Sequence, residues 1–254
     1  MTKVLLDARK ARDFGIGRYV LGLLGGLARR GEFDLSAVVF PGDAGLLPAG
    51  VTPLLSTAGH STAGELVAVR GAIARGKPDL FHAPHYVVPL FPPRATVVTI
   101  HDLMHRTRPE HATLPKRAYA SWMLRRAARL SARIITVSGA VRREVAEAFP
   151  SAAAKLVVVP NGVGPEFRAG APAAAGTPYL LFLGNDKPHK NLDGLALAFG
   201  RVARAGMPHR LVLAGGAPER REARLAAARA AGIADRLVDL GVLPDSDILP
   251  LLAG

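Results

Sequence analysis

The stretch PYLLFLGNDKPHKN, residues 178–191, decides how this chain is organised. Its first part, Pro178 to Leu183, is apolar and is followed by a glycine, a pattern that is typical of a buried strand. A polar loop comes next, and from Asn191 to Ala205 apolar residues recur at helical spacing. A strand, a loop and a helix in this order predict one β/α unit of a parallel sheet.

The same alternation continues on both sides of this stretch. Downstream, strands are expected at 211–214 and 236–240, with a helix at 219–230 between them. Upstream, strands are expected at 4–7, 35–40, 79–82, 96–101, 133–137 and 155–159, and helices at 15–30, 65–75, 115–132 and 139–149. Residues 41–60, rich in Gly, Pro and Ala, are expected to form a loop. This alternation predicts parallel sheets with helices on both faces.

A low-complexity segment, RAGAPAAAG at residues 168–176, divides the chain. It has no hydrophobic period and is typical of a linker. We therefore expect an α/β protein with two Rossmann-like domains, 1–167 and 177–254, and a ligand cleft between them. The second domain contains about three expected strands, whereas a doubly wound sheet has about five or six, so we expect this domain to be incomplete.

Composition places the chain among globular proteins. Hydrophobic residues make up 49% and charged residues 21%, which allows a buried core. The formal net charge of +13 favours ligands that carry phosphate, whether nucleotides, nucleic acid or anionic lipid. The absence of cysteine excludes disulfides and thiol catalysis and fits a reducing compartment. The sequence has no signal peptide and no apolar run of membrane-spanning length, so a cytoplasmic protein is expected.

Two glycines open the first expected helix, in the segment DFGIGRY at residues 13–19. Gly15 and Gly17 let the backbone approach a ligand closely, the helix N-terminus favours an anion, and Arg18 can add a charge-assisted hydrogen bond. A tight turn into the helix is the alternative interpretation. The third glycine of a dinucleotide fingerprint and its acidic partner are absent, so NAD is not expected.

His101 and Asp102 follow another expected strand. A His–Asp pair at the carboxyl end of a strand is well placed for a ligand cleft, and a histidine can donate a hydrogen bond or share a proton near neutral pH. The alternative is a histidine whose hydrogen bonds are satisfied by the local backbone. The histidines at 82, 85, 105 and 111 do not have the spacing of metal ligands, so no metal site is expected.

The polar loop 184–191 places Lys187 and Lys190 beside a helix N-terminus, where a phosphate would bind. The alternative is a polar turn capped by Asn or Asp, but two cations favour anion binding. Elsewhere, a basic helix at 116–133 carries an apolar face that either packs in the core, the more common role, or rests on an anionic membrane. That expected face consists of Tyr119, Trp122, Met123, Ala127 and Leu130.

Five segments, in this order, resemble the group 1 (family 4-like) retaining glycosyltransferases. They are GIGRY at 15–19, HDLMHRTRPEH at 101–111, ITVSGAVRREV at 135–145, VVVPNGV at 157–163 and YLLFLGNDKPHKNLDGLALAF at 179–199. The resemblance implies a GT-B-like fold, in which two Rossmann-like domains face each other across a cleft. It also implies transfer, with retention, of a sugar such as mannose from a nucleoside-diphosphate donor to a glycan or lipid-linked acceptor. No metal or other cofactor is implied.

The resemblance also implies roles for the residues at the end of the first domain's strands. His101 matches the histidine that contacts the transferred sugar, and Asp102 resembles the neighbour that orders its loop. Gly15 and Gly17, with Arg18 beside them, resemble the loop that faces the donor diphosphate or the acceptor.

The loop of the second domain matches the family less completely. Lys190 matches the basic residue that holds the diphosphate. Many relatives have an arginine directly after the glycine of this loop, where this chain has Asn185, so Lys187 is expected to share the contact with phosphate.

One family feature is missing. Relatives carry an EGFGLP-like segment further along, with two glutamates that bind the donor sugar and ribose, but no glutamate follows Glu222 here. We therefore expect a C-terminally truncated chain that binds its donor weakly. The alternative is a non-catalytic module that binds a glycan or a protein partner. Nucleic acid is not an expected partner, because the sequence lacks aromatic platforms and recognition motifs.

Overall fold

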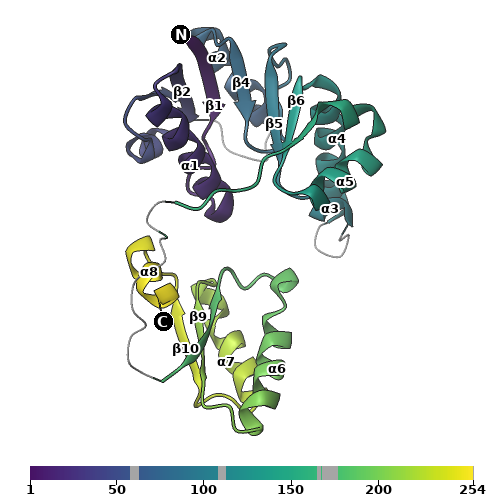
Figure 1. Ribbon diagram of the computed structural model, residues 1–254. Helices are drawn as coiled ribbons and strands as arrows, with labels where there is room; N and C mark the ends of the chain where they lie inside the picture. Colours follow the sequence, from purple (N-terminus) through teal and green to yellow (C-terminus); the bar gives the residue numbers. More distant parts are fainter. Residues whose placement is uncertain (58–62, 108–112, 165–166, 168–176, 254) are drawn as a thin grey trace. The chain divides into compact units, whose positions relative to one another are not determined.

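The computed structural model describes residues 1–57, 63–107, 113–164, 167 and 177–253. The chain divides into two compact units, Met1–Gly162 and Val163–Gly254, and each contains its own parallel sheet (Figure 1). The predicted α/β fold class, with a smaller second sheet, is confirmed. The predicted linker at 168–176 lies outside the described residues.

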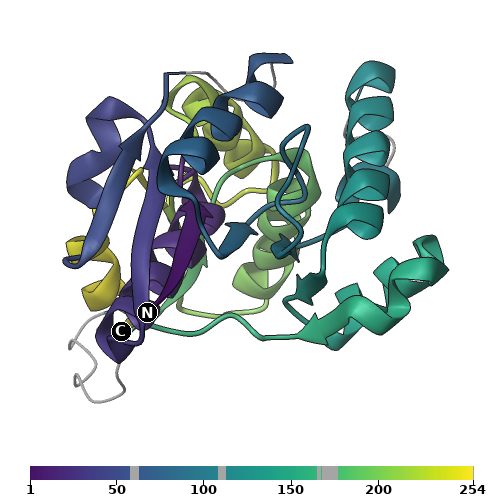
Figure 2. The same cartoon turned by 90° about the horizontal axis from the view of Figure 1, so that it is seen from above.

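Unit 1 is built on a sheet of seven parallel strands in the order β3-β2-β1-β4-β5-β6-β7. The strands are β1 (Thr2–Asp7), β2 (Phe33–Val39), β3 (Val51–Leu55), β4 (Leu80–Ala83), β5 (Thr96–Ile100), β6 (Arg133–Thr136) and β7 (Leu156–Val158). The helices are α1 (Phe14–Arg30), α2 (Ala63–Gly76), α3 (Met104–Thr107), α4 (Leu114–Leu130) and α5 (Gly139–Ala148), with 3-10 turns η1 (Pro41–Leu46) and η3 (Pro150–Lys155). Figure 2 shows this unit from above, with β1 beside β2.

Two apolar clusters fill the two faces of this sheet. Val4 and Leu6 pack in the cluster that includes Val20 and Leu24 of α1, whereas Leu5 packs in the cluster with Leu124 of α4. Successive residues of a strand point to opposite faces, so the alternation along β1 assigns α1 and α4 to opposite sides. Both faces are therefore covered, as expected for a parallel sheet.

The prediction of a loop at 41–60 is wrong, because this region contains η1 and β3. β3 pairs in parallel with β2 at one edge of the sheet. Pro53 obscures the strand in the sequence, since a proline lacks the N–H of a central strand, yet an edge strand tolerates it. Val51 is buried and anchors the strand in the core.

The predicted apolar face of α4 is only partly correct. Met123 and Ala127 are fully buried in the core, but Trp122 is 43% and Leu130 37% exposed. Helix α4 therefore has a core face and a separate exposed apolar strip. No helix in the described part of the chain is long and apolar enough to cross a membrane.

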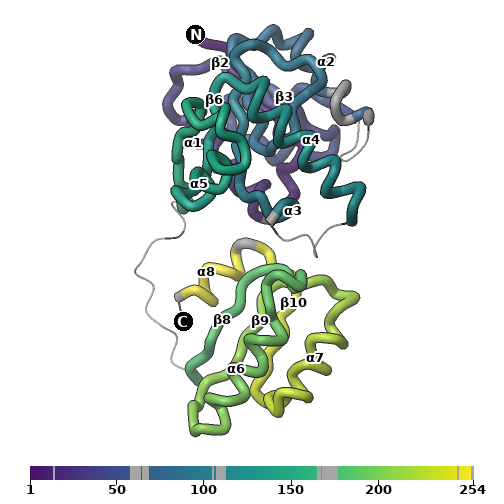
Figure 3. The backbone as a smooth tube through the Cα atoms, turned by 90° about the vertical axis from the view of Figure 1, so that its right-hand side faces the viewer, coloured from purple at the N-terminus to yellow at the C-terminus, as the bar shows by residue number. Residues whose placement is uncertain are grey.

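Unit 2 has three parallel strands in the order β10-β9-β8, with β8 (Tyr179–Leu183), β9 (Arg210–Ala214) and β10 (Leu237–Gly241). Its helices are α6 (Leu192–Arg204), α7 (Arg221–Ala230) and α8 (Asp245–Ala253), with short 3-10 turns η4 (Pro188–Lys190) and η5 (Pro218–Arg220). Leu211 and Leu213 of β9 pack in one cluster with residues of α6 and α7, so both helices cover the same face (Figure 3).

Candidate active site

His101 lies directly after β5, at the carboxyl edge of the first sheet. Its Nε2 is 2.9 Å from the carbonyl oxygen of Pro84, and because a carbonyl only accepts, Nε2 carries a proton. The ring of Tyr19, from α1, packs edge-on against the His101 ring, with 4.9 Å between centroids and 86° between planes. Burial lowers the pKa of His101, although the Pro84 carbonyl and the nearby Asp102 carboxylate oppose this shift. A neutral His101 therefore has an acceptor at Nδ1.

Three polar groups connect behind this histidine. The Tyr19 hydroxyl is 2.9 Å from Thr99 Oγ1, and the same oxygen is 2.9 Å from His82 Nε2. Thr99 is fully buried and His82 is 6% exposed. Burial, reinforced by the positive charge that His101 can carry, lowers the pKa of His82 to about 4, so His82 is neutral at pH 7.

Asp102 is exposed, and its Oδ1 accepts a hydrogen bond of 2.9 Å from the backbone N–H of Met104. This contact satisfies a backbone donor at the start of the short helix α3. The side chain therefore shapes the backbone that follows His101.

The two glycines at the start of α1 differ in their surroundings. A Cβ on Gly17 would lie 2.2 Å from the carbonyl oxygen of Ala11, whereas a Cβ on Gly15 would meet nothing within 4 Å. Gly17 is therefore required by packing of the β1–α1 loop against the helix, and Gly15 leaves open space beside the backbone. Arg18 is exposed on the same helix.

A buried ion pair that the sequence analysis did not identify lies in the same loop. Arg9 Nη2 is 2.7 Å from Asp7 Oδ2, and the Arg9 side chain is only 2% exposed. The pair holds the loop at the end of β1. Its sequence signal, an Asp and an Arg two residues apart, is too common to predict burial.

Glycines also terminate the three strands of unit 2. Gly184, Gly215 and Gly241 follow or end β8, β9 and β10, with φ of 153°, 114° and 65°. A Cβ on Gly215 would lie 2.1 Å from the carbonyl oxygen of Gly184, so the strand ends meet backbone to backbone. A Cβ on Gly184 or Gly241, by contrast, would meet nothing within 4 Å, so space remains close to the main chain there for a ligand.

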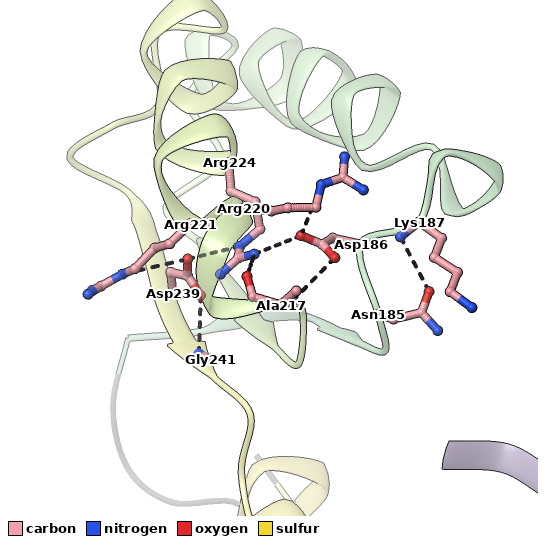
Figure 4. Close-up of polar contacts among 9 residues, drawn as sticks. All are labelled: Asn185, Asp186, Lys187, Ala217, Arg220, Arg221, Arg224, Asp239 and Gly241. Atoms are coloured by element: carbon pink, nitrogen blue, oxygen red, sulfur yellow. Dashed lines mark hydrogen bonds and ion pairs between the residues drawn. The ribbon is translucent and has the colours of Figure 1, made fainter. Parts of the chain in front are cut away.

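Arg224, on α7, links the ends of these strands (Figure 4). Arg224 Nη1 is 2.7 Å from Asp186 Oδ2 and 2.9 Å from the Ala217 carbonyl oxygen, while Arg224 Nε is 3.0 Å from Asp239 Oδ2. The side chains of Arg224, Asp186 and Asp239 are 4%, 7% and 2% exposed. Burial raises the pKa of Asp186, but hydrogen bonds from Arg224 and Ala217 outweigh it, so the net pKa lies below the ordinary value. We call these three side chains the Arg224 cluster.

The predicted phosphate loop lies beside this cluster. Lys187 and Lys190 are exposed, and the Asn185 side chain accepts a hydrogen bond of 3.3 Å from the Lys187 backbone N–H. A groove of about 520 Å³ runs between the first half of α6 and the length of α7, and Lys187 and Arg220 line it. Lys190 is not among the residues that line this groove.

The two parallel α/β units, with glycines and charged groups at their strand ends, give the chain the fold of the GT-B class. The sequence profile described as Glycosyltransferase Family 4 matches residues 15–167. The chain belongs to this family of retaining glycosyltransferases, which transfer a sugar from a nucleotide sugar. The predicted recognition and enzyme class are confirmed.

Solved structures agree in fold. HepE from Anabaena, solved with UDP and glucose, is 17% identical, and the match covers 100% of this chain and 72% of HepE with a TM-score of 0.65. WaaG, a glycosyltransferase involved in lipopolysaccharide biosynthesis, is 15% identical over 100% of this chain and 73% of WaaG, with a TM-score of 0.72. A glycosyltransferase from Rickettsia africae is 13% identical over 99% and 70% of the chains, with a TM-score of 0.67. A search among curated proteins gives no significant match.

Proposed function

We propose that this chain moves a hexose from a nucleoside diphosphate to a glycan or lipid-linked acceptor, with His101 at the transferred sugar and Lys190 and Lys187 at the diphosphate. The observation that carries the proposal is the glycine-lined edge of unit 2, where two exposed lysines lie beside strand ends that open the backbone to a ligand. Gly15 and Arg18 are proposed to add a second anion contact at the start of α1.

The chemistry assigns different tasks to these groups. Negative charge grows on the diphosphate as the glycosidic bond breaks, and cations and backbone N–H groups aimed at it stabilise the transition state. Lys187 and Lys190 supply the cations, and Asn185 holds the loop through its contact with the Lys187 N–H. His101 Nδ1 accepts a hydrogen bond from a hydroxyl of the sugar, and Asp102 keeps the following backbone in place. No step requires a metal.

The donor is proposed to be a UDP-hexose. HepE, which shares the fold, was solved in complex with UDP-glucose. GDP-mannose is the alternative donor, and the acceptor is proposed to be a growing cell-surface polysaccharide or its lipid carrier, since WaaG acts in lipopolysaccharide biosynthesis.

Calorimetry with UDP, GDP and their sugar conjugates tests the binding step. Lys190→Ala should weaken diphosphate binding about tenfold, in line with loss of a charge-assisted contact, whereas Lys116→Ala, an exposed lysine of α4, should not. Transfer and donor-hydrolysis assays then test His101→Ala. Full activity in His101→Ala and unchanged affinity in Lys190→Ala would refute the roles given, and binding without transfer would favour a non-catalytic module.

A peripheral membrane contact is proposed for the exposed strip of α4. Leu114 and Trp122 are 75% and 43% exposed, and Phe91, in the loop that Arg126 contacts, is 64% exposed. The Arg126 guanidinium also lies 5.2 Å from the Trp122 ring centroid, so this surface carries a basic group beside an aromatic one. Flotation with vesicles containing anionic lipid should retain the chain, and Trp122→Ser should weaken retention, whereas neutral vesicles should not bind it.

A further inference from the structure

His101 is constrained on two sides by residues distant in the sequence. The Pro84 carbonyl fixes Nε2 as the protonated nitrogen, and the Tyr19 ring packs edge-on against the imidazole. In the described part of the chain, no hydrogen bond reaches Nδ1. The ring orientation therefore decides where this acceptor points.

The position of Tyr19 depends in turn on Thr99. Their hydroxyl oxygens are 2.9 Å apart although the residues are 80 positions apart, so this bond fixes α1 against the end of β5. Thr99 is fully buried on β5, two residues before His101, and cannot move without disturbing the sheet. The hydroxyl thus holds the Tyr19 ring in one orientation, nearly perpendicular to the His101 ring.

His82 completes the connection from β4. Its Nε2 lies 2.9 Å from Thr99 Oγ1. Thr99 has one hydroxyl hydrogen, so it donates to one of its two neighbours and accepts from the other. A neutral His82 fits both directions, because either of its tautomers presents a donor or an acceptor at Nε2. Burial keeps His82 in that neutral form.

We propose that Tyr19, Thr99 and His82 are positioning residues for His101, which hold its imidazole in one orientation and one tautomer. In that state Nε2 donates to Pro84, and Nδ1 is left to accept a hydrogen bond from a hydroxyl of the donor sugar. The inference rests on the proposed function for the role of Nδ1. The positioning itself is a property of unit 1 and can be measured without substrate.

NMR of the histidine rings in the full chain tests the positioning. Long-range proton–nitrogen spectra should show His101 in the Nε2-protonated tautomer, with a pKa below the ordinary value, and His101→Gln assigns the signal. Tyr19→Phe removes only the hydroxyl, so the ring loses its anchor. We expect a mixture of His101 tautomers and a pKa that moves up toward the ordinary histidine value. Thr99→Val, nearly isosteric, should produce the same change.

Tyr179→Phe is the matched control, because the Tyr179 hydroxyl donates to the Leu251 carbonyl at 2.7 Å within unit 2. It should leave the His101 spectrum unchanged. Unaltered tautomer and titration of His101 in Tyr19→Phe, with a wild-type circular dichroism spectrum, would overturn the proposal. If Thr99→Val fails to fold, Tyr19→Phe decides alone.

Kinetics separate this inference from the proposed function. Tyr19→Phe should lower kcat about tenfold, the order expected for a misplaced group near the reacting centre, while KM for the donor changes less than about twofold. A changed His101 spectrum with full activity in His101→Ala would sustain the positioning and refute the catalytic role. An unchanged His101 spectrum in Tyr19→Phe, together with loss of activity in His101→Ala, would refute the positioning and support the catalytic role.

Discussion

Replacement of Arg224 by methionine should selectively destabilise unit 2. The variant keeps the length and the apolar stem of the side chain but removes the shared cation of Asp186 and Asp239, whose side chains are 7% and 2% exposed. Loss of one partner from a buried ion pair costs about 3–5 kcal/mol, because the remaining charge stays desolvated. In this variant both the Asp186 and the Asp239 carboxylates would lose their shared buried cation.

Two neighbours reduce this cost. Arg220 Nε is 3.7 Å from Asp186 Oδ2, and Arg221 Nε is 3.9 Å from Asp239 Oδ2, but these side chains are 48% and 65% exposed. Exposed pairs contribute less than about 1 kcal/mol. We therefore expect the lower end of the range, about 3 kcal/mol, which corresponds to roughly a hundredfold increase in the unfolded fraction of unit 2.

Amide hydrogen exchange provides the assay. Core amides of β9, such as Leu211 and Leu213, should exchange roughly a hundredfold faster in Arg224→Met if they open by unfolding of the unit. The only tryptophan, Trp122, lies in unit 1, so its fluorescence during urea unfolding should be unchanged and serves as an internal control. Arg221→Met is the exposed-arginine control. An increase below about threefold in β9 exchange would show that the buried cluster does not stabilise this unit.

Three further predictions concern single positions. The pKa of His82 is about 4 in the folded chain and 6.5 in the unfolded chain, so the unfolded chain binds the proton more readily and unit 1 should lose about 3 kcal/mol of stability as the pH falls from 6.5 to 4. Urea unfolding at several pH values should give a steeper dependence of the unfolding free energy on pH for the wild type than for His82→Gln, and equal dependences would contradict the assignment. Gly17→Ala should destabilise unit 1 by about 1–3 kcal/mol through overpacking, whereas Gly15→Ala should be neutral or stabilising; equal melting temperatures for the two variants would argue against the close contact. Gly215→Ala places a side chain at a positive φ and against the Gly184 carbonyl, so it should lower the stability of unit 2 by at least about 2 kcal/mol and weaken nucleotide binding. Full nucleotide affinity of this variant in calorimetry would show that these strand ends are not part of the site.

The sequence predicts where the candidate site residues lie along the strands, but not which side chains they contact. The strand-end positions of His101 and of the loop 184–191 follow from local patterns, since an apolar run followed by polar residues marks the carboxyl end of a parallel strand. The side-chain contacts within the site do not follow from local patterns. Tyr19 meets Thr99 across 80 positions, and Arg224 meets Asp186 across 38. No local spacing encodes such contacts, because they depend on which strands become neighbours.

The sequence alone determined the α/β fold class and the family, because hydrophobic periodicity and short glycine- and lysine-containing motifs are local properties of the chain. Tertiary structure alone decided that β3 forms an edge strand despite Pro53, that Gly17 serves packing, and that His101 is held by Tyr19. The physical reason is the same in each case. Steric fit, burial and the direction of a hydrogen bond are properties of neighbours in space, and strand order brings those neighbours together only in the folded chain.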